Sequence, residues 1–251
     1  MNTLFRHGIG IVFIFIAHLS QAQGFMESQI VPPTKDGILY IYGQESYQMD
    51  ERIPYERIKG SPFWKDEFQL ATLLDKYNRK LIKAPAKLNL LTNEVYFINP
   101  QGEVRVPNAG LVAKVLFHSN DTGIQSVIVF ENNLPVLVET NPNAANPPFV
   151  QVINNGSVQL LKYRKVQIAK ADSLFGTLKR YYFSSQTIYF LNRDNGQTIK
   201  LRKLNEETVT DQLKPDADER TWIKMNRLNL KKEEDVIQFL NYLNTRRKPI
   251  S

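Results

Sequence analysis

The chain of 251 residues contains no cysteine. This absence excludes disulfide bonds, thiolate metal sites and thiol nucleophiles. It also excludes a lipoprotein, because there is no thiol to carry the lipid. The fold must therefore be held together by its hydrophobic core alone. A hydrophobic core can stabilise a domain of this size, since folding buries about 70% of the surface that the unfolded chain exposes.

Histidine is almost as scarce. Of three histidines, His7 and His18 lie near the start of the chain, which leaves His118. A general base needs an orienting carboxylate and a nearby nucleophile. Ser119 and Asp121 are close in sequence, but adjacency fixes no triad geometry, so we interpret His118 as a residue at a strand end beside a turn. Catalytic zinc sites usually take two or more histidines, and we assign no metal ligand.

Long hydrophobic runs are absent too. The longest, Ile9–Ala17, is about half the roughly 20 residues that a membrane-spanning helix needs. Arg6 precedes it, and Ser20 and Ala22 stand where a signal peptidase selects small residues. We therefore predict a signal peptide over residues 1–22 and no transmembrane segment after its removal. The protein is expected in the periplasm, at the outer membrane or outside the cell.

The net charge of the chain is +7, and the leader contributes one cation and no acid, so the remainder carries +6. The cations are dispersed. The densest clusters, "LRKL" (201–204) and "TRRKP" (245–249), are interpreted as solvated faces. For an exported protein, nucleic acid is excluded as a target. Acidic glycans, anionic lipid headgroups or simple solubility explain the charge better.

Strand patterns dominate the middle of the chain. Residues 86–107 predict three successive strands with turns at Thr92-Asn93 and near Gly102. Asn155-Gly156 has the signature of a type I′ turn between two apolar runs, and a second Asn-Gly pair follows near residue 195. The short connections indicate sequential antiparallel pairing. The proline-rich stretch 139–149 is expected to be a long loop within one sheet system.

The pattern changes after Leu204. Asn205 is a good N-cap for one helix, and "DADERTWIKMN" (216–226) predicts a second. The last helix is the clearest, because apolar residues recur at helical spacing with acids before them and arginines after them. Its apolar stripe, which needs a surface to bury against, consists of Val236, Phe239, Leu240 and Leu243.

One stretch, "YERIKGSPFWKDEFQLATLL" (55–74), combines a Gly-Ser-Pro turn, two aromatic residues and an acidic pair. We interpret it as a corner where the chain enters a sheet, with Trp64 largely buried. In the strand that follows, Phe68, Leu70 and Leu74 are expected to face the core.

Carboxylate chemistry is the alternative for this stretch, since a glycosidase needs only two suitably spaced carboxylates. The pairs near aromatic residues are Asp66-Glu67 and Asp50-Glu51. Neighbours along an extended strand point to opposite faces, so neither pair is expected to converge. We assign no catalytic residue, cofactor-binding residue or cofactor.

The expected fold is mainly β, either an antiparallel meander or a half-open barrel or sandwich, with a small C-terminal helical segment. We divide the chain into the signal peptide, a flexible lead-in (23–36), an antiparallel β domain (37–204) and C-terminal helices packed on that domain (205–251).

Two segments, "RIKGSPFWKDEFQLATL" and "AKLNLLTNEVYFI", resemble those of a group of uncharacterised secreted, β-rich proteins of the Bacteroidota type. The likeness includes Lys87, Asn89, Glu94 and Gly102 in the predicted hairpin. It implies a periplasmic or envelope location and a β-rich fold, and it brings no activity and no catalytic residue.

The functional hypothesis is an exported, non-enzymatic binding or scaffolding module whose partner is an envelope protein or a surface polymer. The alternative is a glycan-active hydrolase that uses Asp66 or Glu67. A third hypothesis is an accessory or chaperone-like subunit that pairs with a partner through a sheet edge.

Overall fold

The computed structural model describes residues 38–39, 53–54, 58–119, 126–132, 134–140, 146–171, 180–193 and 196–247. The predicted signal peptide and lead-in lie outside these ranges, as do Asp50, Glu51 and Asp121.

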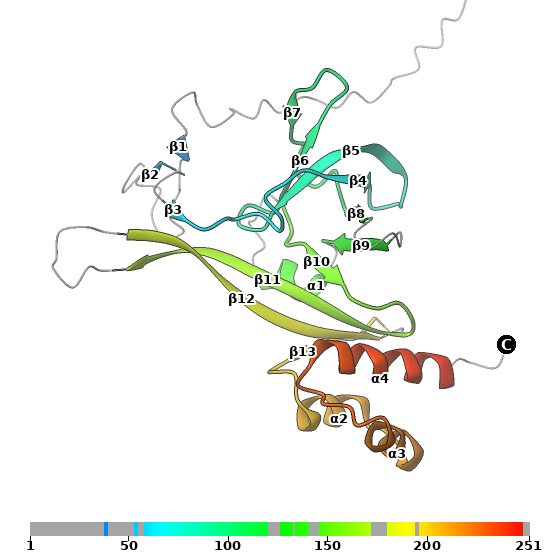
Figure 1. Cartoon of the computed structure of the whole chain (residues 1–251). Coiled ribbons are helices and arrows are strands. Elements are labelled where there is room, and N and C mark those ends of the chain that lie inside the picture. The colour runs from blue at the N-terminus through cyan, green and yellow to red at the C-terminus, as the bar shows by residue number, and fades with distance from the viewer. Residues whose placement is uncertain are drawn as a thin grey trace, which may run out of the picture.

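Most of the described chain belongs to one open, largely antiparallel sheet of eleven strands (Figure 1). Its strand order is β13-β12-β11-β10-β9-β8-β4-β5-β6-β7, and β3 pairs with β12 in parallel. The strands are β3 (Ile58–Lys59), β4 (Gln69–Leu74), β5 (Lys80–Asn89), β6 (Glu94–Ile98), β7 (Val104–Arg105), β8 (Lys114–Ser119), β9 (Ser126–Glu131), β10 (Val150–Val152), β11 (Val158–Ala171), β12 (Arg180–Arg193) and β13 (Thr198–Leu201). A separate antiparallel pair consists of β1 (Ile38–Leu39) and β2 (Ile53–Pro54). The predicted mainly β, antiparallel fold is confirmed.

The pairing departs from a simple meander at β3, which pairs in parallel with the distant β12, and at β8. β5, β6 and β7 extend the sheet on one side of β4, and the chain then returns so that β8 pairs with the other side of β4. The expectation that consecutive strands pair throughout is therefore wrong at β8. The turns at Asn93 and Gly102 are confirmed, since both residues have positive φ.

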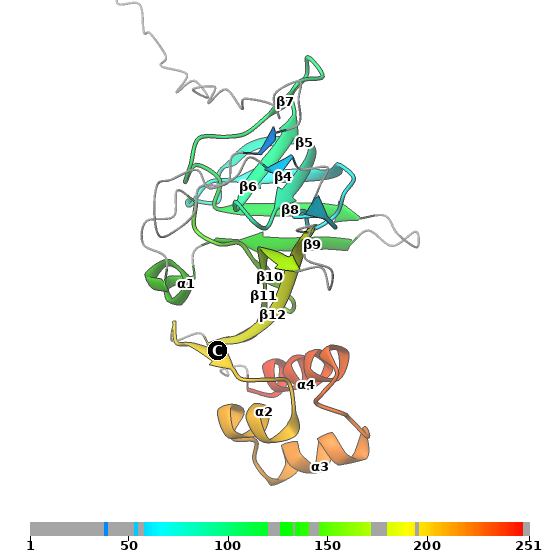
Figure 2. The ribbon, with the colours of Figure 1, turned by 90° about the vertical axis from the view of Figure 1, so that its left-hand side faces the viewer.

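Four helices complete the described structure: α1 (Pro135–Thr140), α2 (Glu206–Leu213), α3 (Ala217–Met225) and α4 (Glu233–Arg246). The last three lie below the long β11–β12 hairpin, on the opposite side from β4, β5 and β8 (Figures 1 and 2). None of the helices in the described ranges has the length and apolar character needed to cross a bilayer.

The predicted C-terminal helices are confirmed, and so is the apolar stripe of α4. Its four residues are fully buried against Leu160 of β11, Leu191 of β12 and apolar residues of α2 and α3. Asn205 caps α2 by accepting a hydrogen bond from the Thr208 backbone N–H at 3.0 Å. Such a cap satisfies one of the backbone donors that a helix leaves free at its start.

The end of the hairpin next to the helices is buried on both of its faces. Leu160 and Leu191 face the helices, whereas the next residues in each strand, Leu161 and Phe190, pack with α1 on the other side. Farther along, Val166 and Phe183 of the same hairpin contribute to the main core under β4, β5, β6, β8 and β9.

The Gly-Ser-Pro stretch forms the expected corner. The Leu90 backbone N–H donates to the Pro62 carbonyl at 2.8 Å, and the Trp64 N–H donates to the Leu88 carbonyl at 2.9 Å. The Trp64 ring packs on Phe117 and Phe130, with centroids 4.7 and 5.1 Å apart. Trp64 is half-buried against the main core, so it closes the sheet end and does not form an exposed platform.

The expected burial of β4 is wrong by one residue. Ala71 and Leu73 are buried, whereas Leu70 is 46% exposed. Because side chains alternate along a strand, a shift of one residue exchanges the two faces. The sequence interpretation chose the face of Leu70 and Leu74 because their side chains are long and apolar. In the structure the small side chain of Ala71 lies in the core instead.

The β10–β11 hairpin is confirmed, but its turn is not of type I′. That turn needs positive φ at both central residues, and only Gly156, at φ 129°, has it. The turn is held instead by Asn244 of α4. The Asn244 Oδ1 accepts from the Val158 N–H at 2.8 Å, and the Nδ2 donates to the Asn155 and Val158 carbonyls at 3.1 and 2.9 Å.

This contact predicts that Gly156→Ala lowers the free energy of unfolding by about 3 kcal/mol, from backbone strain and the loss of buried hydrogen bonds. A Cβ at Gly156 would lie 2.3 Å from Asn244 Nδ2. Urea unfolding measures the loss. Gly196→Ala is the matched control, because Gly196 also has positive φ but no atom within 4 Å of such a Cβ. Equal losses in the two variants would contradict the Asn244 contact.

Candidate binding site

Those residues singled out from the sequence that the structure describes do not come together into one site. His118 lies half-buried on β8, with its Nε2 2.9 Å from Thr72 Oγ1 on the neighbouring strand β4. This contact ties two adjacent strands, as expected of a histidine at a strand end.

Asp66 and Glu67 are both exposed at the corner before β4. The Ser61 hydroxyl donates to the Asp66 carboxylate, and the same hydroxyl oxygen accepts from the Phe63 N–H at 3.1 Å. The Asp66 side chain is therefore part of the turn. In the part of the chain that the structure describes, no three histidine or acidic side chains gather as a metal site would require.

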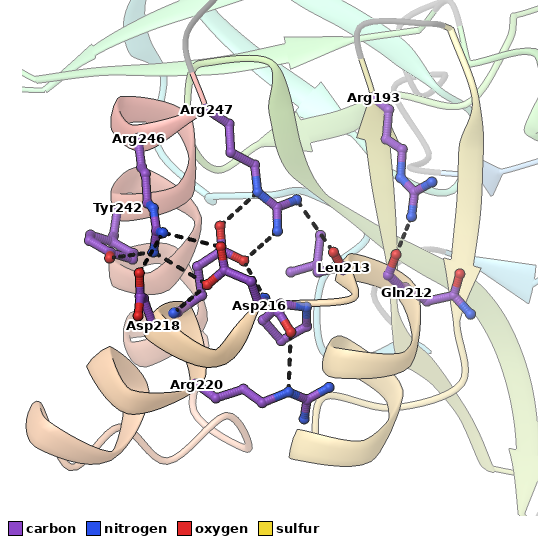
Figure 3. Close-up of polar contacts among 11 residues, drawn as sticks. Arg193, Gln212, Leu213, Asp216, Asp218, Arg220, Tyr242, Arg246 and Arg247 are labelled. Atoms are coloured by element: carbon purple, nitrogen blue, oxygen red, sulfur yellow. Dashed lines mark hydrogen bonds and ion pairs between the residues drawn. The ribbon is translucent and has the colours of Figure 1, made fainter.

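A basic cleft of about 380 Å³ lies where the end of β12 meets the β10–β11 turn and the C-terminal ends of α2 and α4 (Figure 3). The residues that line it are Ser157, Val158, Arg193, Gln212, Leu213, Lys214 and Arg247. They include three cations and no carboxylate. We refer to this feature as the basic cleft.

Two of the cations are fixed by the end of α2. A helix leaves its last carbonyl groups without partners, and arginine side chains satisfy them well. Arg193, the last residue of β12, donates to the Gln212 carbonyl, and Arg247 Nη1 donates to the Leu213 carbonyl at 3.4 Å. The arginines are therefore held in place before any ligand arrives.

Arg247 is also paired with a buried acid. Its guanidinium donates through two nitrogens to the Glu219 carboxylate of α3, and the Nε to Oε1 distance is 2.8 Å. The Glu219 side chain is only 2% exposed. Hydrogen bonds from Arg247 lower the pKa of Glu219 in spite of its burial, and the carboxylate in turn raises the pKa of Arg247.

The neighbouring Arg246 binds two further acids, Asp216 at 3.1 Å and Asp218 at 3.0 Å (Figure 3). Arg246 and Arg247 of "TRRKP" are exposed, as expected of a solvated face, but their ion pairs also join α4 to α3. Arg202 and Lys203 of "LRKL" are exposed, as expected.

Lys214 differs from the two arginines. It is the C-cap residue of α2, in the left-handed conformation at φ 47°, and its backbone N–H donates to the Thr210 carbonyl at 2.8 Å. Its side chain is exposed and makes no ion pair with the described residues. The basic cleft thus combines two fixed guanidinium groups with one exposed ammonium group, a set that suits a carboxylate, phosphate or sulfate.

The Glu219–Arg247 pair predicts a pH-dependent contribution to stability. A carboxyl whose pKa is lowered by folding stabilises the protein above its unfolded value, about 4.3, and loses this effect as the pH falls through its folded pKa. Glu219→Gln should cost about 2 kcal/mol at neutral pH, which allows for the exposure of Arg247. It should also flatten the dependence of the unfolding free energy on pH below about 4.3.

Urea titrations at neutral and acidic pH test this expectation. Glu207→Gln is the matched control, because Glu207 is an exposed acid in the first turn of α2. If wild type and Glu219→Gln keep the same acid slope, Glu219 does not have the lowered pKa.

Comparison of the chain with protein-family models, with curated proteins and with solved structures finds no match. The fold and the basic cleft therefore have to be interpreted from their own geometry, and the resemblance to secreted proteins of the Bacteroidota type stays a prediction.

Proposed function

We propose that the protein is an exported, non-enzymatic binding or scaffolding module of the cell envelope and that it holds an acidic partner at the basic cleft. The observation that carries this proposal is the set of lining residues, which includes Arg193, Lys214 and Arg247 and no carboxylate. Because Glu219 neutralises Arg247 from behind, Arg193 and Lys214 supply the net positive charge. Export is supported by the leader sequence, and the envelope location also by the resemblance described above.

The size and rigidity of the basic cleft support binding. Its volume falls in the usual range of ligand sites, about 300–1,000 Å³. Arg193 and Arg247 are fixed by the end of α2, and Glu219 holds Arg247 a second time. Groups that are already ordered lose little conformational entropy when a ligand arrives, so more of the interaction energy remains as affinity.

The partner is expected to present negative charge, either as a surface polymer with acidic sugars or as an acidic segment of another envelope protein. An arginine forms two parallel hydrogen bonds to a carboxylate or a phosphate, and a lysine adds a charge without a fixed geometry. Scaffolding is compatible with this site, since residues of the sheet and of the helices line the basic cleft together.

A pull-down from an envelope extract tests the proposal. The wild-type chain should retain an acidic component that high salt releases, because salt screens exposed charges. The double variant Arg193→Gln, Lys214→Gln should retain at least tenfold less. Protease treatment of the extract beforehand distinguishes a polymer, which survives it, from a protein.

The matched control is Arg202→Gln, Lys203→Gln, which removes the same charge from two exposed residues that do not line the basic cleft. Circular dichroism confirms that each variant is folded. Equal loss of retention in both double variants would show that net charge, and not the basic cleft, binds the partner.

A further inference from the structure

The turn between β4 and β5 is a second basic feature, far from the basic cleft in the fold. It consists of Asp75 to Lys80, with the sequence "DKYNRK". Its cations Lys76, Arg79 and Lys80 are exposed, and the Tyr77 side chain is 65% exposed. Tyr77 belongs to none of the hydrophobic cores of the described structure. We refer to these residues as the basic turn.

The basic turn is rigid because Asp75 organises it. Asp75 is buried, and its Oδ1 accepts from the Tyr77 and Arg79 backbone N–H groups, both at 2.9 Å. Its Oδ2 accepts from Arg79 Nε at 2.7 Å. Asn78 takes the left-handed conformation at φ 59°, which asparagine tolerates better than most residues. The position of Tyr77 is thus fixed in the free protein.

The charge of the basic turn is positive after internal pairing. Asp75 is its one acid, and Arg79 neutralises it, which leaves Lys76 and Lys80. On the adjacent β8, Lys114 forms an ion pair with Glu131 at 3.4 Å, so this neighbour adds no net charge. A fixed aromatic residue with two free lysines beside it therefore points toward solvent.

The cations beside Tyr77 also limit what can bind its ring. Lys76 Nζ lies 5.0 Å and Arg79 Cζ lies 5.2 Å from the ring centroid, both over the ring. A sugar would have to displace a cation before it could stack there. In a lipid headgroup region no cation has to be displaced. A tyrosine lies there with its hydroxyl toward water, while lysine and arginine contact the phosphates.

We propose that the basic turn docks the protein reversibly on an anionic lipid surface. This inference goes beyond the proposed function and does not depend on it. β4 and β5 lie on the far side of the β11–β12 hairpin from α2, α3 and α4 (Figures 1 and 2). A partner in the basic cleft and a membrane at the basic turn can therefore be held at the same time.

Vesicle co-sedimentation tests the docking. The chain from Gln23 onward is used, because the apolar run of an uncleaved leader would itself bind lipid. Vesicles of phosphatidylcholine alone are compared with vesicles that contain phosphatidylglycerol in equal amount. Binding is expected only to the anionic vesicles and should fall as salt is added.

Two variants locate the contact. Each exposed cation near an anionic surface strengthens binding about fivefold, so Lys76→Gln, Lys80→Gln should weaken it about 25-fold. Tyr77→Ala should weaken it severalfold through loss of the aromatic anchor. Arg79 is left in place because it holds Asp75. The matched control, Lys200→Gln, Lys203→Gln, removes two exposed cations at the helical end and should bind as wild type does.

Three outcomes would overturn the proposal. The first is equal binding to both kinds of vesicle, or none. The second is an equal loss in the control, which would make net charge the cause. The third is binding of alginate, a polymer of acidic sugars, that depends on Tyr77 while vesicle binding does not, which would assign the basic turn to a polysaccharide. None of these results bears on the basic cleft, whose test uses other residues.

Discussion

The β11–β12 hairpin is the element on which the other parts of the described structure depend. Its two strands pair without interruption over fourteen residue pairs. At the end next to the helices, neighbouring side chains enter different cores: Leu160 and Leu191 pack on the helices, whereas Leu161 and Phe190 pack with α1. A strand that is solvated on one face could not join two layers in this way. The basic cleft follows from this arrangement, because Arg193 reaches α2 only where β12 ends against the helices.

The sequence predicts best those parts that depend on contacts close along the chain. The helix cap at Asn205 and the stripe of α4 could be recognised because their signals lie within a few turns of one helix. The hairpins could be recognised from their Asn and Gly turn residues for the same reason. The turn type at Gly156 could not, because Asn244, almost ninety residues later in the chain, decides its conformation.

The misjudged features depend on partners distant in sequence. Ala71 is buried where Leu70 was expected. Pairing with β5 and β8, and not side-chain size alone, determines which face of β4 lies against the core. Arg247 pairs with Glu219, which lies 28 residues earlier in the chain, and no local sequence pattern predicts this ion pair. The basic cleft was missed for the same reason, since four separate segments supply its lining. One local indication was available. A helix was expected to end near Lys214, and another helix was expected to carry arginines at its own end.

The net charge of +7 therefore says less about a partner than the way in which individual cations are used. The arginines at both basic sites have structural roles, since Arg247 and Arg79 bind buried carboxylates. The planar guanidinium group suits this, because it makes several hydrogen bonds in a fixed geometry. The lysines beside them, Lys214 and Lys76, remain exposed and make no ion pair with the described residues. In each site the arginine fixes the surface and the lysine supplies the charge left to attract a ligand. Both proposals rest on this combination of an ordered arginine and an exposed lysine, and not on the total charge of the chain.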